Sequence, residues 1–268
     1  MELKLNSAQQ AAGILAVFAI GAITKNDFHS QVLIHLAATL GFGLILFYIF
    51  QALTKQTKNI WNTVISCLII FLVLHYGLKP TDAFAAMIAT FVVLVSKFFL
   101  EWKGSPIFNP VVLGLFVLEL LALIFPNFQN SFTSWWGASY SLILIALWMA
   151  FYLKTYRKWA LTLSYLIVFA LGVLIFYKAP PSGGNSLDFL KFTFTDSTIY
   201  FFTFVMLAEP RTSPLLKKQQ IIYGTMAGII SILSLLTNFP TSALLAILIP
   251  NFYFFITKWL MLRKMANA

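Results

Sequence analysis

Long apolar runs, separated by short polar segments, limit what this chain can fold into more than any other feature. A bilayer core of about 30 Å needs about 20 apolar residues as a helix, since each residue rises about 1.5 Å. The sequence therefore predicts an all-α polytopic membrane protein with about ten transmembrane helices, at 11–24, 31–53, 60–77, 83–100, 109–126, 138–153, 159–177, 196–208, 221–237 and 243–261. The first, sixth and eighth of these runs are short.

Composition supports the membrane interpretation. Hydrophobic residues make up 60% of the 268 residues and charged residues 10%, whereas a soluble domain has about 25% charged residues. The apolar surplus must face lipid. The net charge of +10 comes from basic residues placed singly or in small groups between the runs, which argues against a nucleic-acid partner. Cys67, the single cysteine, excludes an intrachain disulfide and any cysteine-rich metal or iron–sulfur site made by this chain alone.

The distribution of basic residues predicts the orientation. If the N-terminus is inside and ten spans alternate, 14 of the 18 basic residues lie on the inner side, and the outer four are Lys25, Lys79, Lys178 and Lys191. Cytoplasmic segments carry such an excess of Lys and Arg, so both termini are expected in the cytoplasm of a protein of the inner or plasma membrane. An alternative interpretation of the first run is a signal peptide, with residues 19–22 as its cleavage site; the preceding Glu2 favours a retained span.

An internal similarity lies within this single transmembrane domain, residues 1–268. At an offset of 114 residues, an acidic residue, a basic residue and a glycine recur, each between similar apolar stretches: Asp82 and Asp196, Lys97 and Arg211, Gly114 and Gly228. The pattern indicates two structural repeats, at about 1–126 and 130–268, with chance similarity as the alternative.

The eighth run is too short to cross a bilayer. Its 13 residues reach about 20 Å, and Glu209–Pro214 follow as a segment with two prolines. Broken helices are tolerated where protein or a polar cavity surrounds them, and they often form binding sites. The alternative is an ordinary cytoplasmic loop after a helix-ending proline. The longest polar stretch, 178–195, is expected to be an outer loop.

Two short stretches resemble the NqrB/RnfD family. One is Phe-Val-Met-Leu-Ala-Glu-Pro-Arg-Thr-Ser-Pro at 204–214, followed by Gly224 and Gly228; the other is Ser-Pro-Ile-Phe-Asn-Pro at 105–110, followed by Gly114. The first family stretch usually has Asp where this chain has Glu209. Family members are large flavin-carrying membrane subunits of the sodium-translocating NADH:quinone reductase and of the Rnf ferredoxin:NAD oxidoreductase.

The resemblance implies a membrane subunit of a redox complex that binds a flavin-type carrier (FMN or riboflavin) and passes electrons within or across the membrane, with coupled cation translocation. The implied partners are membrane lipid and other subunits, such as a flavoprotein or a cytochrome. The Ser/Thr-Gly-Ala-Thr motif that carries covalent FMN in the family is not present, so any flavin is expected to be non-covalent. The expected flavin-binding residues are Asn109, Glu209, Arg211, Thr212 and Ser213.

Some of these residues also suggest roles by their own chemistry. Asn109 and the following Pro110 have the pattern of a helix start. Arg211 can offer its fork of donors to a phosphate or a ring carbonyl, and Glu209 can neutralise it. Glu119 lies within an apolar run, where an ionised group is unfavourable, which predicts an ion pathway unless it lies nearer a helix end.

Other chemistries have weaker support. His35 and His75 sit at similar predicted depths and could ligate a haem, although packing is the simpler interpretation; no other metal site is expected. The sequence has no Walker loop, dinucleotide fingerprint or nucleophile elbow, so NAD or ATP chemistry would belong to another subunit. The alternative functions are a non-redox transporter or channel with a broken-helix site at the bilayer midplane, and a structural anchor for a partner enzyme.

Overall fold

A computed structural model describes residues 6–25, 30–74, 80–125, 141–177, 185–237 and 242–266. In this part of the chain the fold is helical apart from one small hairpin. The elements are α1 (Ser7–Lys25), α2 (Ser30–Leu36), the π-helix η1 (Ala37–Gly41), α3 (Phe42–Thr54), α4 (Ile60–Val73), α5 (Pro80–Phe99), β1 (Glu101–Trp102), β2 (Ser105–Pro106), α6 (Pro110–Ile124), α7 (Ser141–Tyr156), α8 (Trp159–Phe176), α9 (Ser186–Thr195), α10 (Ser197–Phe201), the π-helix η3 (Phe202–Leu207), α11 (Lys217–Thr237) and α12 (Ser242–Ala266).

The predicted all-α polytopic architecture is confirmed. Each of the ten apolar runs contains a helix, and the second forms one continuous helix, Ser30–Thr54, that includes a π-helical turn. Six helices in the described part are long and apolar enough to cross a membrane. Three apolar helices are shorter, at Ile60–Val73, Pro110–Ile124 and Ser197–Leu207. With about 1.5 Å of rise per residue, none of these three reaches about 30 Å.

The expectation of a loop over 178–195 is wrong for its second half. Residues 186–195 form α9, and residues 178–184 lie outside the described part. A capping box starts this helix: Asn185 Oδ1 accepts from the Asp188 backbone N–H at 2.9 Å, and Asp188 Oδ2 accepts from the Asn185 backbone N–H at 3.1 Å. Two reciprocal bonds of this kind satisfy donors that a helix start otherwise leaves without partners.

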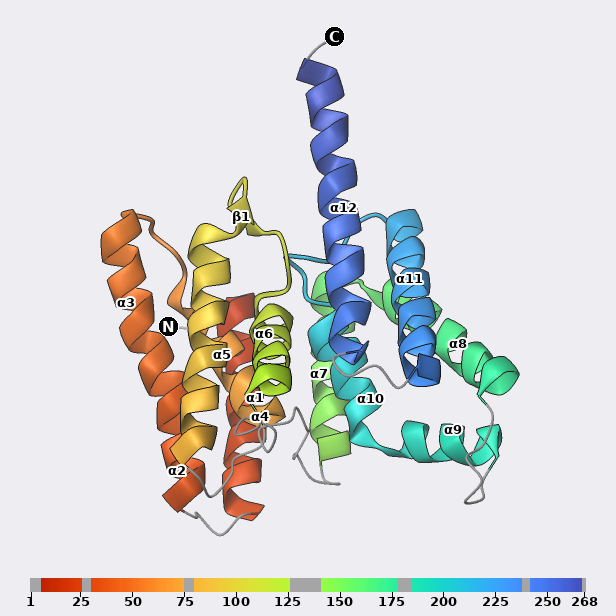
Figure 1. The fold of residues 1–268 in the computed structure, drawn as a ribbon, viewed down its shortest axis with the longest axis horizontal. Helices are drawn as coiled ribbons and strands as arrows, with labels where there is room; N and C mark the ends of the chain where they lie inside the picture. The colour runs from red at the N-terminus through yellow and green to blue at the C-terminus, as the bar shows by residue number, and fades with distance from the viewer. Residues whose placement is uncertain are drawn as a thin grey trace.

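The helices form two groups that lie side by side, α1–α6 and α7–α12 (Figure 1). The hairpin lies beyond the end of α5, and α6 begins well below that level, so the chain turns back into the body before the new helix starts (Figure 1). A helix that starts within the body places its free backbone N–H groups among protein atoms. This arrangement makes room for a polar site between the helices.

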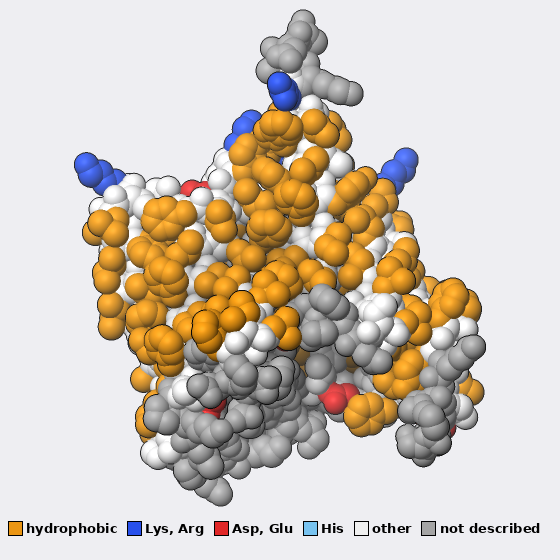
Figure 2. Space-filling model, in the orientation of Figure 1, with side chains coloured by type: hydrophobic (Ala, Val, Ile, Leu, Met, Phe, Trp, Pro, Cys, Tyr) orange, Lys and Arg blue, Asp and Glu red, His pale blue; other side chains and the backbone are white. Residues whose placement is uncertain are grey.

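The outer surface has the character expected of a protein in lipid. In Figure 2 hydrophobic side chains cover most of the described surface, and the visible Lys and Arg side chains stand along its upper margin. Large apolar side chains on α3, α8 and α11 are about half exposed or more, for example Leu53, Ile175 and Leu233. Such continuous apolar exposure is unfavourable in water and favourable in a bilayer.

Glycines allow the closest helix contacts. Gly224 and Gly228 of α11 lie directly on α8, where an added Cβ at Gly224 would overlap the Leu161 carbonyl oxygen. Gly114 of α6 lies instead on the Ala89 carbonyl of α5. The two glycines of the 114-residue repeat thus pack against different helices, and the internal repeat stays a prediction.

Candidate functional site

The first motif loop, residues 101–109, joins α5 to α6. It begins as a hairpin whose turn residues, Lys103 and Gly104, have φ of 50° and 76°. Two such residues give the turn the twist that a two-residue hairpin needs. The loop ends at Asn109, whose Oδ1 accepts hydrogen bonds from the backbone N–H groups of Val111 (3.0 Å) and Val112 (3.2 Å). The predicted helix start at Asn109 and Pro110 is therefore confirmed.

The second motif loop, residues 208–216, joins η3 to α11. It is tightly folded on itself: Thr212 Oγ1 donates to Glu209 Oε2 at 2.7 Å, and Ser213 Oγ donates to the Glu209 carbonyl at 2.6 Å. Lys158, which is fully buried at the start of α8, donates from Nζ to the carbonyls of Ser213 (2.9 Å) and Pro214 (2.6 Å). A buried ammonium group thus fixes the far end of the loop.

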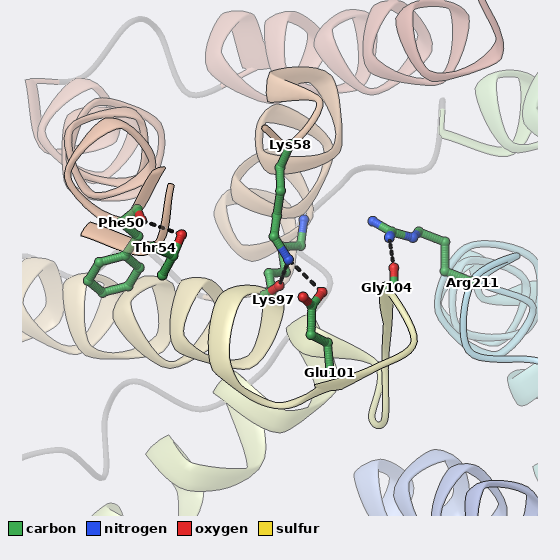
Figure 3. Close-up of polar contacts among 7 residues, drawn as sticks. All are labelled: Phe50, Thr54, Lys58, Lys97, Glu101, Gly104 and Arg211. Atoms are coloured by element: carbon green, nitrogen blue, oxygen red, sulfur yellow. Dashed lines mark hydrogen bonds and ion pairs between the residues drawn. The ribbon is translucent and has the colours of Figure 1, made fainter. Parts of the chain in front are cut away.

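The two motif loops contact one another directly. Arg211 Nη2 donates to the Gly104 carbonyl at 2.8 Å, so the hairpin turn and the second loop are joined (Figure 3). Deeper in the protein, Asn109 Nδ2 donates to the Met206 carbonyl at 2.9 Å. Asn109 therefore both starts α6 and ties it to the end of η3, two segments that are far apart in sequence.

Lys58 links the segment before α4 to the first motif loop and to the end of α5. Its Nζ lies 2.5 Å from Glu101 Oε2 and donates to the Lys97 carbonyl at 2.5 Å (Figure 3). Lys97 itself is 7% exposed and donates from Nζ to the Asn62 carbonyl. The basic residue of the first half of the proposed repeat is therefore turned inward and held by α4.

An inner cavity of about 170 Å³ lies where these elements meet. The first turns of α1, α4 and α6 border it, and its polar lining includes Asn62, Lys97, Asn109, Glu209 and Arg211. Helix starts carry partial positive charge, and they add to Lys97 and Arg211. Glu209 is the one carboxylate among the described residues of this lining, so the cavity favours electron-rich or anionic atoms.

An outer groove of about 560 Å³ adjoins the inner cavity, and both are bordered by Pro106, Pro210 and Arg211. The groove lies between the hairpin, the second motif loop and α12. Aromatic rings form part of its wall: Trp102 meets Phe255 edge to face at 5.8 Å between centroids, and Lys258 Nζ lies 5.4 Å from the centroid of Trp102. Thr212 and Ser213 line the same groove.

Burial shifts the ionisation of two groups around the second motif loop. It raises the pKa of the Glu209 carboxyl, although the hydrogen bond from Thr212 and the charges of Lys97, Arg211 and Lys158 act in the opposite direction. Burial also lowers the pKa of Lys158 to about 8, against the attraction of Glu209. Desolvation of a charged form explains both directions.

A pH dependence follows for Lys158. Its folded pKa of about 8 lies below the ordinary 10.5, so between these values the unfolded chain holds a proton that the folded chain has released. Stability conferred by this group therefore rises with pH across this window and is lost as pH falls through about 8. We expect the melting temperature of the wild type to rise relative to that of Lys158→Met from neutral to alkaline pH. Melting temperatures of the two proteins that change in parallel with pH would contradict this. The control is Lys217→Met, which replaces an exposed lysine.

The structure brings the five predicted flavin-binding residues together. Asn109, Glu209 and Arg211 line the inner cavity, whereas Arg211, Thr212 and Ser213 line the outer groove. Their binding of a cofactor stays a prediction. Glu119 lies in the third turn of α6 and borders neither space, so its role in an ion path also stays a prediction.

The haem alternative stays a prediction, because only one of its two histidines is among the described residues. His35 of α2 is buried and lies 5.4 Å from the ring of Phe71, between centroids, while His75 lies outside the described residues. In the described ranges, no three His, Cys, Asp or Glu side chains gather as a metal site would require. Cys67 is buried and unpaired, as a small apolar residue would be.

Sequence reasoning missed Asn251, which joins both motif loops. Its Oδ1 accepts from the Asn109 backbone N–H at 2.9 Å, and its Nδ2 donates to the Thr212 carbonyl at 3.3 Å and to Tyr223 Oη at 2.7 Å. An amide within the apolar run 243–261 was the available signal, because a polar group there needs a partner inside the protein.

Comparison with known proteins agrees with the second motif loop. The model of the NQR2, RnfD, RnfE family matches residues 124–265, which include the second motif loop, α8, α11 and all but the last residue of α12. A search of curated proteins gave no significant match. Since the matched region covers more than half of the 268 residues, the chain belongs to the NQR2, RnfD, RnfE family.

Proposed function

We propose that this chain is the flavin-holding membrane subunit of an Nqr- or Rnf-type electron-transport complex. It binds a flavin-type carrier non-covalently in the cleft formed by the inner cavity and the outer groove, and it passes electrons within or across the inner membrane with coupled cation translocation. Both termini are on the cytoplasmic side, and other subunits supply and accept the electrons. Family membership supports the assignment to such a complex, and the cleft supports the binding of a flavin-type carrier.

The size and chemistry of the cleft fit a flavin. The outer groove, at about 560 Å³, is within the range of about 300–1,000 Å³ that is usual for small-molecule sites. The inner cavity, at about 170 Å³, is close to the roughly 150 Å³ that holds a benzene ring, so it can take one edge of a larger ring system. The rings of Trp102, Phe254 and Phe255 offer apolar faces to a flat aromatic ligand.

The polar residues would orient the ring. When bound, a flavin supplies one- and two-electron transfer, and the protein tunes its potential. Arg211 carries a fixed positive charge at the boundary of the two spaces and favours the electron-rich carbonyl edge of the ring. The hydroxyl hydrogens of Thr212 and Ser213 go to Glu209, which leaves their oxygens to accept from an imide N–H.

The position of Arg211 is the observation that carries this proposal. Among the described lining residues it is the charged one that both spaces share, it belongs to the stretch that resembles the family, and its guanidinium joins the two motif loops through Gly104. A ligand that extends across both spaces has to pass this side chain.

Flavin titration of the detergent-purified protein tests the proposal. We expect riboflavin and FMN fluorescence to be quenched on binding and acid precipitation to release all flavin. Arg211→Gln should weaken binding about tenfold, because one charge-assisted hydrogen bond contributes about 1.5 kcal/mol and about 1.4 kcal/mol is tenfold. The control is Lys191→Gln on α9, which is exposed and lines neither space. Absence of binding by either flavin would overturn the proposal and favour a non-redox solute site.

A further inference from the structure

The helix α12 has a weak point where it passes the outer groove. Pro250 lies in the interior of this helix, which begins at Ser242 and ends at Ala266. Proline has no backbone N–H, so the Ala246 carbonyl lacks its usual helical donor, and the proline ring crowds that carbonyl. Sharp bends in helices occur at such positions. The next residue, Asn251, is 2% exposed and lines the groove.

The Asn251 side chain bonds to three other segments at this weak point. It reaches Asn109 at the start of α6, Thr212 in the second motif loop and Tyr223 in α11, at 2.9, 3.3 and 2.7 Å. All three bonds are buried or partly buried, where an unmade hydrogen bond costs about 1–3 kcal/mol. One amide therefore sets the position of α12 relative to both motif loops.

Beyond Asn251, the outer half of α12 (residues 251–266) holds the groove closed mainly through rings. Phe252 stacks on Phe108 at 6.0 Å between centroids, and Phe255 and Lys258 lie against Trp102 of the hairpin. Such aromatic and cation–π contacts contribute about 0.5–1.5 kcal/mol each. Figure 1 shows this half of α12 projecting past the ends of the neighbouring helices. Phe254 of this half also lies 5.8 Å from the ring of Tyr223 in α11, between centroids, so these ring contacts and the Asn251 bonds are what a movement of the outer half would have to break.

We propose that the outer half of α12 is a lid on the outer groove, with Pro250 as its hinge and Asn251 as the positioning residue that holds the lid and both motif loops in the closed arrangement. When the Asn251 bonds are made, the rings of Phe254 and Phe255 complete the groove wall. When the Asn251 bonds are broken, the lid moves away from the hairpin, and the two motif loops lose the side chain that bonds to both of them. What the groove holds rests on the proposed function, whereas the hinge and the tether do not.

Distance measurements between spin labels test the lid. Labels are placed at Leu53→Cys, at the end of α3, and at Met261→Cys, in the lid; both positions are more than half exposed, and the native Cys67 is fully buried. We expect a narrow distance distribution in the otherwise unchanged protein. Asn251→Ala should shift this distribution and remove its narrow peak. A second pair, Leu53→Cys with Ile249→Cys, places the label before the hinge and should give the same distribution with and without Asn251→Ala.

Two further variants keep the test decisive if Asn251→Ala folds poorly. Tyr223→Phe removes the bond between the tyrosine hydroxyl and Asn251, together with a longer bond of 3.5 Å from that hydroxyl to the Ile247 carbonyl, and should broaden the Met261 distribution partly. Pro250→Ala restores a helical hydrogen-bond donor at the hinge and should make the Met261 distance distribution narrower than in the protein that carries only the two labels. Asn185→Ala, which removes an exposed helix cap, is the control for a general loss of stability and should leave it unchanged. Unchanged distributions in both Asn251→Ala and Tyr223→Phe would overturn the lid.

Riboflavin separates this inference from the proposed function. In the protein that carries only the two labels, riboflavin should narrow the Leu53–Met261 distance distribution further, and this additional narrowing should be lost in Asn251→Ala. If Asn251→Ala alters the distribution while riboflavin has no effect in any variant, the lid stands and the flavin proposal fails. If riboflavin binds but the distribution is the same in the wild type and Asn251→Ala, the flavin proposal stands and the lid fails.

Discussion

Gly224→Leu is expected to prevent the chain from reaching its folded state. Helices α8 and α11 pack more closely than any side chain at this position allows, since even a Cβ would overlap the Leu161 carbonyl oxygen and Ser164 Oγ. A serine hydroxyl can rotate away, but a backbone carbonyl within a helix cannot. Overpacking at such a contact typically costs 1–3 kcal/mol and more where backbone must move, so we expect a loss of about 3 kcal/mol or more.

Size-exclusion chromatography and thermal melting of the detergent-purified protein measure this loss. We expect aggregated or absent protein for Gly224→Leu, and a folded but less stable protein for Gly224→Ala. Gly13→Leu is the matched control, because nothing lies within 4 Å of a Cβ added there. A Gly224→Leu protein that is monodisperse and melts with the wild type would show that α8 and α11 do not pack as described.

The positions of the helices could be predicted from the sequence, because lipid demands long apolar runs and internal backbone bonds. The Asn109 cap was also readable, since Asn followed by Pro is a local signal. The helix α9 was missed because its stretch is polar overall, although Asn185 and Asp188 form a capping box visible at their spacing. The π-helical turns η1 and η3 have no sequence signal of this kind.

The site was predictable only where the sequence carries a motif. The two motif loops were chosen by their resemblance to a family, and the structure brings them into contact through Arg211 and Gly104. Lys158 and Asn251 escaped notice because their roles depend on tertiary contacts with segments 55 and 142 residues away. A lysine before a span fits an ordinary interfacial position, and nothing local reveals that its ammonium group turns inward.

Asn109→Ala is expected to lower both the stability of the protein and its affinity for flavin. The Asn109 side chain caps α6 through Val111 and Val112 and donates to the Met206 carbonyl, with 3% of its surface exposed. Loss of a cap costs about 0.5–2 kcal/mol, and a buried carbonyl left without its donor costs about 1–3 kcal/mol. The sum is roughly 1.5–5 kcal/mol, or about tenfold to several-thousandfold in the folding equilibrium, at about 1.4 kcal/mol for each factor of ten.

Asn109→Ser separates the two contributions, because serine can cap α6 but is too short to reach Met206. Its melting temperature should lie between those of the wild type and Asn109→Ala. Asn185→Ala, which loses only the exposed cap of α9, should lose about 1 kcal/mol and keep full flavin affinity. Since Asn109 lines the inner cavity whereas Asn185 lies far from it in sequence and outside both linings, only Asn109 links stability to binding. Equal losses in Asn109→Ala and Asn185→Ala would mean that the tie between α6 and η3 contributes nothing, and that the two motif loops hold their positions without it.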